Sequence, residues 1–491
     1  MKYGHKFVGA NADFITYFNK EKDKNMDIVG KIAGGHKETV ESARNILRDG
    51  GNAFDAAVAG VFSSLVCEYL YTSAAGGGAM LVCKNNSSPV LVDFFVETPK
   101  IKKDRVSDFE KIVADFGGTK QEFHIGWGAV GVPGLLPGLI HIHKRFGVLP
   151  FRVLVEQAIE IGKNGAKISK NQEYLTRVLR PVISSSEEIK KLFLKDGKFL
   201  KYGDKFYNKK FSSFLSHFLY EDPETFYINE VCPLFYGALS EGGIISLSDL
   251  QNYQTKERKP LSKQYKQYTV FTNPAPSTGG QTIFAGLDAL VNKKTVGPHE
   301  IESALIAANK KNNRGASKIG STTHLSIIDK ENNVASVTTT NGVGCGRTVP
   351  GTGIMPNNML GEKHLNPGGF HTWKKQSRIP SNIAPTALFK ENALVVALGS
   401  AGSSRIVSAT LCTLSNLVNN KMDLASAIKS PRIHLEGDTL HHEPLDVSGV
   451  SPSFKTKKVV SWKEKNMYFG GVNAVGVGLS FGDDRRNGYS C

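Results

Sequence analysis

Apolar residues recur at helical spacing near the start of the chain and at alternating spacing further along. In residues 38–49 the spacing predicts a helix that ends at the Gly50-Gly51 pair. Asn52 is a favourable N-cap for a second helix, which we expect to run to Val66. Residues 53–66 are apolar on nearly every side, so this helix is predicted to be buried.

A strand hairpin is predicted about two thirds of the way along the chain. Residues 323–329 (THLSIID) alternate apolar with polar, residues 331–333 (ENN) form a turn, and residues 334–340 (VASVTTT) alternate again. Because successive side chains of a strand point to opposite faces, polar groups gather on one face of each strand: Thr322, His324 and Ser326, and Ser336, Thr338 and Thr340. The preceding residues 311–321 are basic and polar, a composition typical of an exposed linker that tolerates a cut.

Further strands are predicted at residues 76–84, 89–99 and 393–400. The last of them is followed by the loop AGSSR and by a helix over residues 406–420. The chain therefore mixes helices with strands, and no internal repeat is present. The only candidate boundary is the linker at about residues 311–321.

Composition and charge narrow the class of protein. With 491 residues, 40% of them apolar and 22% charged, the chain has the composition of a globular protein. Its formal charge of +16 comes from Lys and Arg spread over the whole length, which disfavours a nucleic-acid interface. No apolar run approaches a membrane span or a signal peptide, and the six cysteines are scattered. We therefore expect free thiols and a cytoplasmic protein, with a periplasmic or extracellular one as the alternative.

The Thr322-Thr323 pair stands where the linker meets the hairpin. A threonine hydroxyl is a weak nucleophile unless a base lies beside it, and an N-terminal threonine supplies its own α-amine as that base. Such an amine titrates near ~7.7–8, so part of it is neutral at working pH. A cut before Thr322 would create this arrangement, and the strand would hold the new terminus in place. On these residues alone, two ordinary strand formers are the favoured explanation of the pair.

Nine segments in the same order resemble the gamma-glutamyltranspeptidase family of N-terminal-nucleophile hydrolases. They span nearly the whole chain and read ESARNILRDGGNAFDAAVA, SAAGGGAML, GVPGLLPGL, GGIISLSDLQNY, PAPSTGGQ, TTHLSIIDKENNVASVTTT, PGTGIMPNNML, LGSAGSSRI and YFGGVNAV. The resemblance implies an α+β fold, the αββα sandwich in which two antiparallel sheets lie between helical layers. It also implies a precursor that is cut into a large subunit 31–321 and a small subunit 322–491. Residues 1–30 by themselves are expected to form a peripheral segment.

The resemblance also implies roles for particular residues. Cleavage would fall between Ser321 and Thr322, with Thr322 as the nucleophile and Thr340 supporting it. The backbone N–H groups of Gly402 and Ser403 would form the oxyanion hole. Ser381 would hold the α-carboxylate of the substrate, and no metal or organic cofactor would be needed.

The chain departs from the family pattern where the substrate is held. The family has an Arg before the glutamate that matches Glu97, and here that Arg is missing. Asn341 is shifted by one position, Glu362 takes the place of an aspartate, and Asn382 takes the place of a second serine. We keep Asn341, Glu362 and Asn382 as candidate substrate-binding residues. Ser403 also replaces the second glycine of the oxyanion loop.

The predicted function is hydrolysis or transfer of the γ-glutamyl group of a small molecule such as glutathione. The missing Arg favours an alternative, an amide acylase of the cephalosporin or glutaryl type, and a further alternative is a non-catalytic scaffold that is never cleaved. The two subunits of one precursor would associate, and neither nucleic acid nor membrane is an expected partner. His324 is predicted to be a packed strand histidine, Cys345 a buried thiol, and the His441-His442 pair not to share a metal ion.

Overall fold

A computed structural model describes most of the chain and supports its arrangement in layers. The described residues are 29–101, 107–115, 120–311, 321–445 and 454–491. The predicted peripheral segment 1–30 and the predicted linker therefore lie almost wholly outside the described residues.

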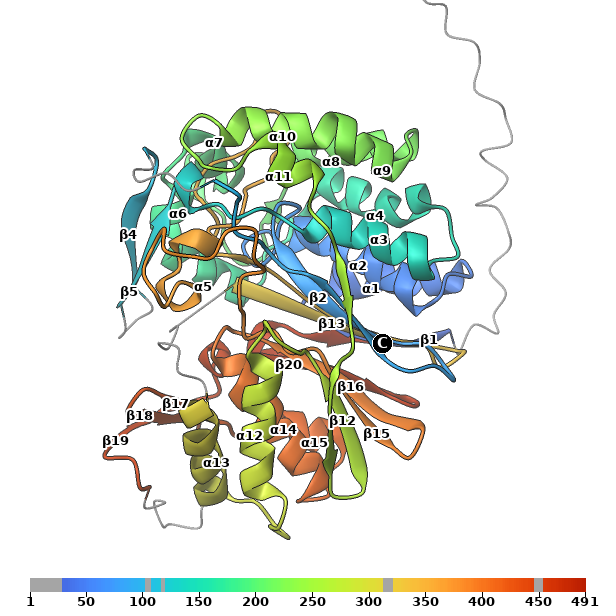
Figure 1. Cartoon of the computed structure of the whole chain (residues 1–491), viewed down its shortest axis with the longest axis vertical. Helices are drawn as coiled ribbons and strands as arrows, with labels where there is room; N and C mark the ends of the chain where they lie inside the picture. Colours follow the sequence, from blue (N-terminus) through green and yellow to red (C-terminus); the bar gives the residue numbers. More distant parts are fainter. Residues whose placement is uncertain (1–28, 102–106, 116–119, 312–320, 446–453) are drawn as a thin grey trace, which may run out of the picture.

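The first of two facing sheets has seven strands, all antiparallel to their neighbours, in the order β10-β3-β2-β14-β13-β1-β22 (Figure 1). Their bounds are β1 Gly30–Gly34, β2 Gly77–Cys83, β3 Val90–Phe94, β10 Lys256–Arg258, β13 Ser321–Asp329, β14 Val334–Gly342 and β22 Tyr489–Ser490. The predicted hairpin forms the centre of this sheet as β13 and β14. The strands predicted at residues 76–84 and 89–99 are present as β2 and β3.

The second sheet has six strands, again all antiparallel, in the order β11-β12-β15-β16-β20-β21. Their bounds are β11 Leu261–Tyr265, β12 Tyr268–Thr272, β15 Thr386–Lys390, β16 Ala393–Ala401, β20 Gly471–Gly476 and β21 Leu479–Gly482. The remaining strands form small sheets at the periphery: β4 Glu110–Asp115, β5 Lys120–Ile125, β6 Ala166–Lys167, β7 Leu194–Lys195, β8 Lys198–Phe199, β9 Lys205–Phe206, β17 Ile433–Glu436, β18 Thr439–His442 and β19 Lys458–Ser461.

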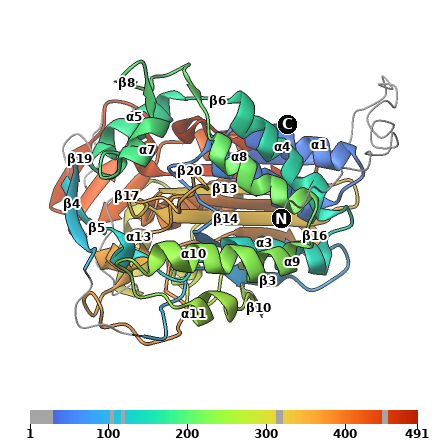
Figure 2. The ribbon, with the colours of Figure 1, turned by 90° about the horizontal axis from the view of Figure 1, so that it is seen from above.

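Helices cover the outer face of each sheet (Figures 1 and 2). The first sheet is covered by α1 Lys37–Arg48, α2 Ala53–Cys67, α3 Leu135–Phe146 and α4 Phe151–Asn164, with the shorter α5 Lys170–Val178, α6 Arg180–Ile183, α7 Glu187–Leu192, α8 Lys209–Ser216, α9 Pro223–Phe226, α10 Cys232–Leu239 and α11 Leu247–Gln251 outside them or at the edge. The second is covered by α12 Gly279–Leu290, α13 Pro298–Lys311, α14 Arg405–Val418 and α15 Leu424–Lys429. The order of layers is therefore αββα, as predicted.

Helix α2 forms as the sequence predicted. The Asn52 side chain accepts the backbone N–H groups of Phe54 and Asp55, and every residue of α2 is buried. The Ala53 N–H donates to Asp329 Oδ2 at 2.9 Å, which pins the start of α2 to the end of β13. This contact holds the central hairpin against the helical layer.

The space between the two sheets is polar around His324. Its ring contacts Thr338 Oγ1 and Ser326 Oγ at 2.8 Å each, and burial lowers its pKa to about 3. The Asn473 side chain of β20 donates to the His324 carbonyl, which ties the second sheet to the first. Gly399 leaves room for the imidazole, because a Cβ built there would lie 2.3 Å from the ring. His324 is therefore the packed histidine that was predicted and not a base for Thr322.

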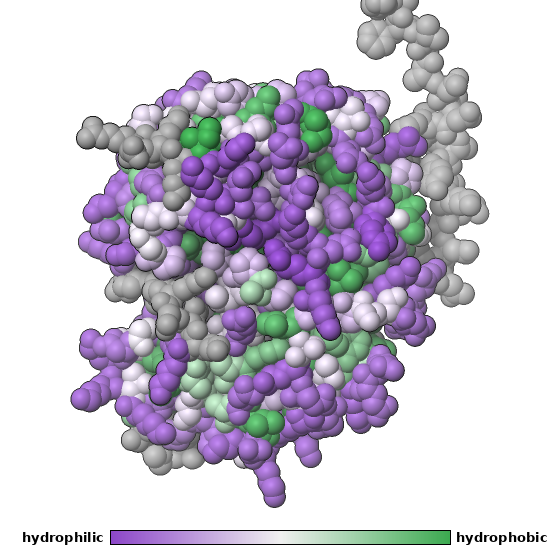
Figure 3. Space-filling view, viewed as in Figure 1, coloured by the Kyte–Doolittle hydropathy of each residue, from purple (hydrophilic) through white to green (hydrophobic). Residues whose placement is uncertain are grey.

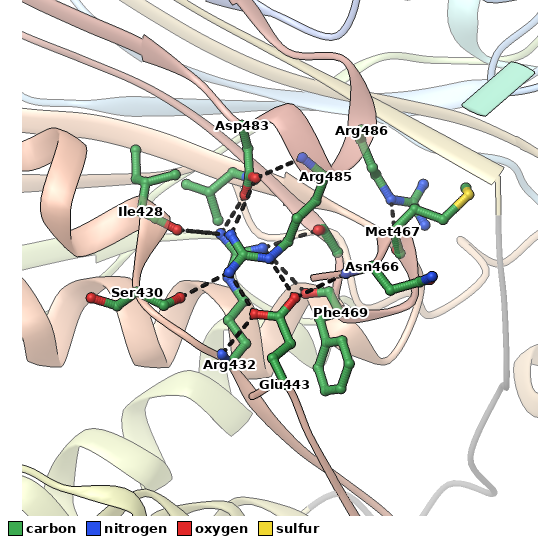
Figure 4. Close-up of polar contacts among 12 residues, drawn as sticks. Ile428, Ser430, Arg432, Glu443, Asn466, Met467, Phe469, Asp483, Arg485 and Arg486 are labelled. Carbon is green, nitrogen blue, oxygen red and sulfur yellow. Dashed lines mark hydrogen bonds and ion pairs between the residues drawn. The ribbon is translucent and has the colours of Figure 1, made fainter. Parts of the chain in front are cut away.

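A buried cluster of charges anchors the last residues of the chain (Figure 4). Arg485 pairs with Glu443 at 2.5 Å and with Asp483 at 3.3 Å, and Asp483 also pairs with Arg432. The neighbouring Arg486 is buried as well. Each carboxylate accepts several charge-assisted hydrogen bonds, so the turn that carries Arg486 is firmly held.

The face of the molecule that is seen in Figure 3 is mostly polar. Figure 3 shows hydrophilic side chains over most of one face, with apolar residues in small separate patches. No helix in the described part of the chain is both long enough and apolar enough to cross a bilayer.

Candidate active site

Thr322 lies at the start of β13, opposite Thr340 on the neighbouring strand β14. Thr322 pairs in register with Thr340 of β14, and the register shifts between Ser321 and Thr322. The Thr340 hydroxyl donates a hydrogen bond to the carbonyl oxygen of Ser321, which is the carbonyl of the predicted cleavage site. The N–H of Gly342 donates to Thr340 Oγ1 at 3.2 Å and fixes this hydroxyl from behind.

A small pocket of about 30 Å³ gathers most of the predicted site residues around Thr322. It has room for roughly one water molecule. The predicted residues that line it are Thr322, Thr340, Glu362, Ser381, Asn382 and Ser403, and the others are Phe95, Gly342, Met359, His364, Leu365, Ile383 and Ile406. Residues from β13 and β14 of the first sheet, from α14 and from several connecting segments thus meet at one point.

Gly402 and Ser403 form the turn between β16 and α14. Both have left-handed backbone, with φ of 118° at Gly402 and 56° at Ser403. A Cβ at Gly402 would lie 3.1 Å from Arg486 Nη2 and 3.2 Å from Gly470 Cα, so the position favours glycine. Ser403 lines the pocket beside Thr322, and successive N–H groups of such a turn suit an oxyanion.

Ser381 and Asn382 are positioned by the residues just before α12. The Thr278 N–H donates to the Ser381 carbonyl at 2.8 Å, and its hydroxyl donates to Asn382 Oδ1 at 3.2 Å. The Ser277 hydroxyl also donates a hydrogen bond to the backbone carbonyl of Ser381, at 2.9 Å. The backbone of Ser381 is therefore held by hydrogen bonds while its side chain lines the pocket.

Glu362 is a buried carboxylic acid at the wall of the pocket. Burial raises its pKa to about 8, and its Oε1 has no hydrogen-bond partner among the described residues. Its other oxygen lies 3.4 Å from His364 Nδ1. A buried carboxylate of this kind is suited to a cationic group, because the opposite charge would offset its desolvation.

Asn341 is not at the pocket, in contrast to the expectation from the sequence. Its side-chain amide donates to the carbonyls of Met355 and Pro356, at 3.0 and 3.4 Å, on the far side of β14. Thr340 and Gly342 line the pocket and Asn341 does not, because adjacent residues of a strand point to opposite faces. The shift of one position that the sequence revealed thus moves the amide away from Thr322.

Phe95 lines the pocket in the segment from which the family arginine is missing. The nearby Arg378 is buried and lies 3.3 Å from Asp93 and 3.5 Å from Glu97, so it serves these carboxylates. No Lys or Arg is present among the described residues that line the pocket. A substrate carboxylate would therefore find hydroxyl, amide and imidazole groups but no Lys or Arg side chain.

Glu68 is a site residue that the sequence analysis missed. It accepts hydrogen bonds from Thr323 Oγ1 at 2.5 Å and from Thr39 Oγ1 at 2.8 Å. Burial raises its pKa to about 7. It thus binds Thr323, the neighbour of Thr322, from the helical side of the sheet. The available signal was one glutamate at the end of a mostly apolar helical run.

Two facing antiparallel sheets between helical layers, with a threonine at the start of a central strand, define the class of N-terminal-nucleophile hydrolases. The sequence model of gamma-glutamyltranspeptidase matches residues 39–304 and 285–486 of this chain. The chain therefore belongs to the gamma-glutamyltranspeptidase family. The predicted family and the predicted fold are both confirmed, and the chain is a member of a family of autoprocessed enzymes.

Curated relatives and a solved structure agree with this assignment. The glutathione hydrolase proenzyme of Bacillus subtilis is 26% identical over 96% of this chain and 92% of its own. The acylase ACY 1 proenzyme of a Pseudomonas species is 26% identical over 94% of this chain and 92% of its own. The crystal structure of cephalosporin acylase from Bacillus halodurans has a TM-score of 0.79 at 18% identity, over 94% of this chain and 96% of that one, and supports the fold.

Proposed function

We propose that the protein is made as a precursor that cleaves itself between Ser321 and Thr322. Thr322 Oγ attacks the carbonyl carbon of Ser321, the C–N bond breaks, and the acyl group moves to oxygen as an ester. Water then hydrolyses the ester and leaves a carboxylate on Ser321 and a free amine on Thr322. The observation that carries this proposal is the hydrogen bond from the Thr340 hydroxyl to the Ser321 carbonyl oxygen, where negative charge develops during attack.

After cleavage, Thr322 acts as an N-terminal nucleophile on a side-chain amide. Its α-amine takes the proton from Oγ as Oγ attacks the amide carbonyl, and the same amine returns a proton to the leaving group. The N–H groups of Gly402 and Ser403 hold the oxyanion, a contribution of typically ~3–4 kcal/mol to the barrier for one such donor. Water or an amino acceptor then releases the acyl group from Thr322.

The acyl donor that we propose is a γ-glutamyl compound such as glutathione. Glu362 would pair with the α-ammonium group of the donor, and the Ser381 hydroxyl and Asn382 amide would contact its α-carboxyl group. Curated relatives that act on glutathione support this choice. The second candidate is an amide acylase, favoured by a pocket that Phe95 lines and to which, among the described residues, no Lys or Arg contributes.

The test of self-cleavage compares three variants on a denaturing gel and by sequencing of amino ends. Wild-type protein is expected to give two fragments, one of which begins at Thr322. Thr322→Ala stays intact and inactive, because the nucleophile is gone. Thr340→Val cleaves more slowly by at least about tenfold, and Thr340→Ser retains cleavage, because only the hydroxyl is needed.

Cleavage of Thr322→Ala at the same bond would refute the mechanism. A wild-type chain that is never cleaved and never active would indicate the scaffold alternative. Processed enzyme assayed with γ-glutamyl and glutaryl anilides then separates the two catalytic candidates, because the glutaryl group lacks the ammonium that Glu362 would bind.

A further inference from the structure

A second cavity of about 270 Å³ adjoins the nucleophile pocket and has no part in the reaction described above. The two cavities share four lining residues, His364, Leu365, Ser381 and Asn382. The other lining residues come from α12, α13, α14 and the β17 region: Thr282, Leu305, Asn309, Ser404, Val407, Ser408, His434, Leu435 and Gly437. A ligand that reaches Ser381 and Asn382 from Thr322 can thus continue into this space.

The polar wall of this cavity is ordered before any ligand enters. Ser408 Oγ and His434 Nδ1 lie 2.6 Å apart, and both residues are almost fully buried. His434 Nε2 lies 3.8 Å from Glu436, which accepts a hydrogen bond from Tyr468. The imidazole of His434 is neutral near pH 7, because burial lowers its pKa to about 4.

The lining of this cavity is of mixed polarity, and among the described residues it contains no Lys, Arg, Asp or Glu. Leu305, Val407 and Leu435 supply apolar surface, and Asn309, Ser404 and Ser408 supply amide and hydroxyl groups. Among the described residues, neither cavity is lined by Lys or Arg. Placing a free carboxylate here without a cation would carry a desolvation cost, whereas a neutral amide with an aliphatic side chain matches both kinds of surface.

We propose that this cavity is a binding subsite for an uncharged group attached to the α-carboxyl of the acyl donor through an amide bond. The substrate class is then a γ-glutamyl donor whose α-carboxyl is itself amidated, with an extension about the size of one amino-acid residue. This inference rests on the proposed function, in which Ser381 and Asn382 contact the α-carboxyl end of the acyl group.

The experiment compares two chromogenic donors on the processed enzyme. Both are γ-(4-nitroanilides) of glutamate: one has a free α-carboxylate, and in the other this carboxyl is joined to leucinamide. We expect kcat/KM to be higher for the extended donor by about tenfold or more. A factor of this size is typical of one buried polar group that lacks a hydrogen-bond partner. A preference for the free carboxylate would overturn the proposal.

A pair of neighbouring variants tests whether the extension occupies this cavity. Asn309→Trp narrows the mouth of the cavity, whereas Lys310 is exposed and does not line it. Asn309→Trp is expected to abolish the preference for the extended donor and to leave kcat/KM for the short donor unchanged, and Lys310→Trp is expected to leave both unchanged. An unaltered preference in Asn309→Trp would place the extension elsewhere and overturn the subsite.

The failure of this inference differs from failure of the proposed function. If the short donor is hydrolysed by wild-type enzyme and not by Thr322→Ala, but the extended donor is not preferred, only the subsite is refuted. If neither donor gives Thr322-dependent release of nitroaniline, the proposed γ-glutamyl function itself fails.

Discussion

The carboxyl group of Glu68 is deeply buried and contacts Thr323, the residue that follows the proposed nucleophile Thr322. Thr323 and Thr39 each donate to one of its oxygens, so the carboxyl links α2 to the start of β13. Desolvation raises its pKa from 4.5 to about 7, even though both hydrogen bonds favour the charged form. Burial is therefore the dominant effect at this residue.

Replacement of Glu68 by Gln is expected to change how stability depends on pH. Between pH 4.5 and about 7 the folded protein holds a proton that the unfolded chain has lost, so the free energy of unfolding falls as pH rises through this window. Gln does not titrate. The free energy of unfolding of Glu68→Gln, taken relative to that of wild type, should therefore rise by an amount of the order of 3 kcal/mol between pH 4.5 and 8. Denaturant melts at several pH values measure this difference.

The control for this prediction is Glu187→Gln, at a side chain that is 71% exposed. Its difference from wild type should stay near zero at every pH, because most of this side chain remains in contact with water after folding. A constant offset between Glu68→Gln and wild type across pH 4.5–8 would contradict the prediction.

The sequence predicted the positions of some site residues correctly and not those of others. Thr322, Thr340, Ser381, Asn382, Glu362 and Ser403 were expected at one site and line one pocket. Asn341 was also expected there, but the alternation of β14 turns it away. Glu68 could not be assigned, because the contact joins residues 255 positions apart and depends on how α2 packs on β13.

At the scale of elements, the central hairpin shows what the alternation of apolar and polar residues can predict and what it cannot. Alternation predicted both strands correctly, yet a polar face usually indicates contact with water. Here every residue of β13 and β14 is buried, and the polar face lies against the second sheet. The sequence alone could not reveal this, because the covering strands β16 and β20 follow much later in the chain. The polar groups are instead satisfied by one another and by backbone carbonyls such as those of Leu398 and Asn473.

The close approach of the two sheets makes Gly399 of β16 a sensitive position. A Cβ there would lie 2.3–2.7 Å from three atoms of the His324 ring, which is held by two hydrogen bonds. Gly399→Ala is therefore expected to destabilise the protein by about 1–3 kcal/mol or more, the usual cost of overpacking. Gly237→Ala is the matched control, because a Cβ there meets nothing within 4 Å. Equal melting temperatures for the two variants would show that the sheets separate easily at this point.

At the scale of the whole molecule, both sheets are built from both proposed subunits. In the first sheet, β13 and β14 of the proposed small subunit lie between β1 and β2 of the large one. Val334 to Thr340 of β14 pair with Cys83 to Gly77 of β2, and β13 pairs with β1. In the second sheet, β12 pairs with β15 across the same division. Separating the fragments would break backbone ladders in both sheets and expose two buried cores.

We therefore expect the processed fragments to stay together as one folded unit. On a native sizing column, the processed protein should elute as a single peak that contains both fragments, at the position of intact Thr322→Ala. The fragments should separate only in denaturant, because unpaired strand edges and exposed apolar surface oppose dissociation. Cleavage then frees the Thr322 amine without loosening the sheets that position it. Elution of folded residues 322–491 apart from the large fragment under native conditions would show that this interleaving does not hold the enzyme together.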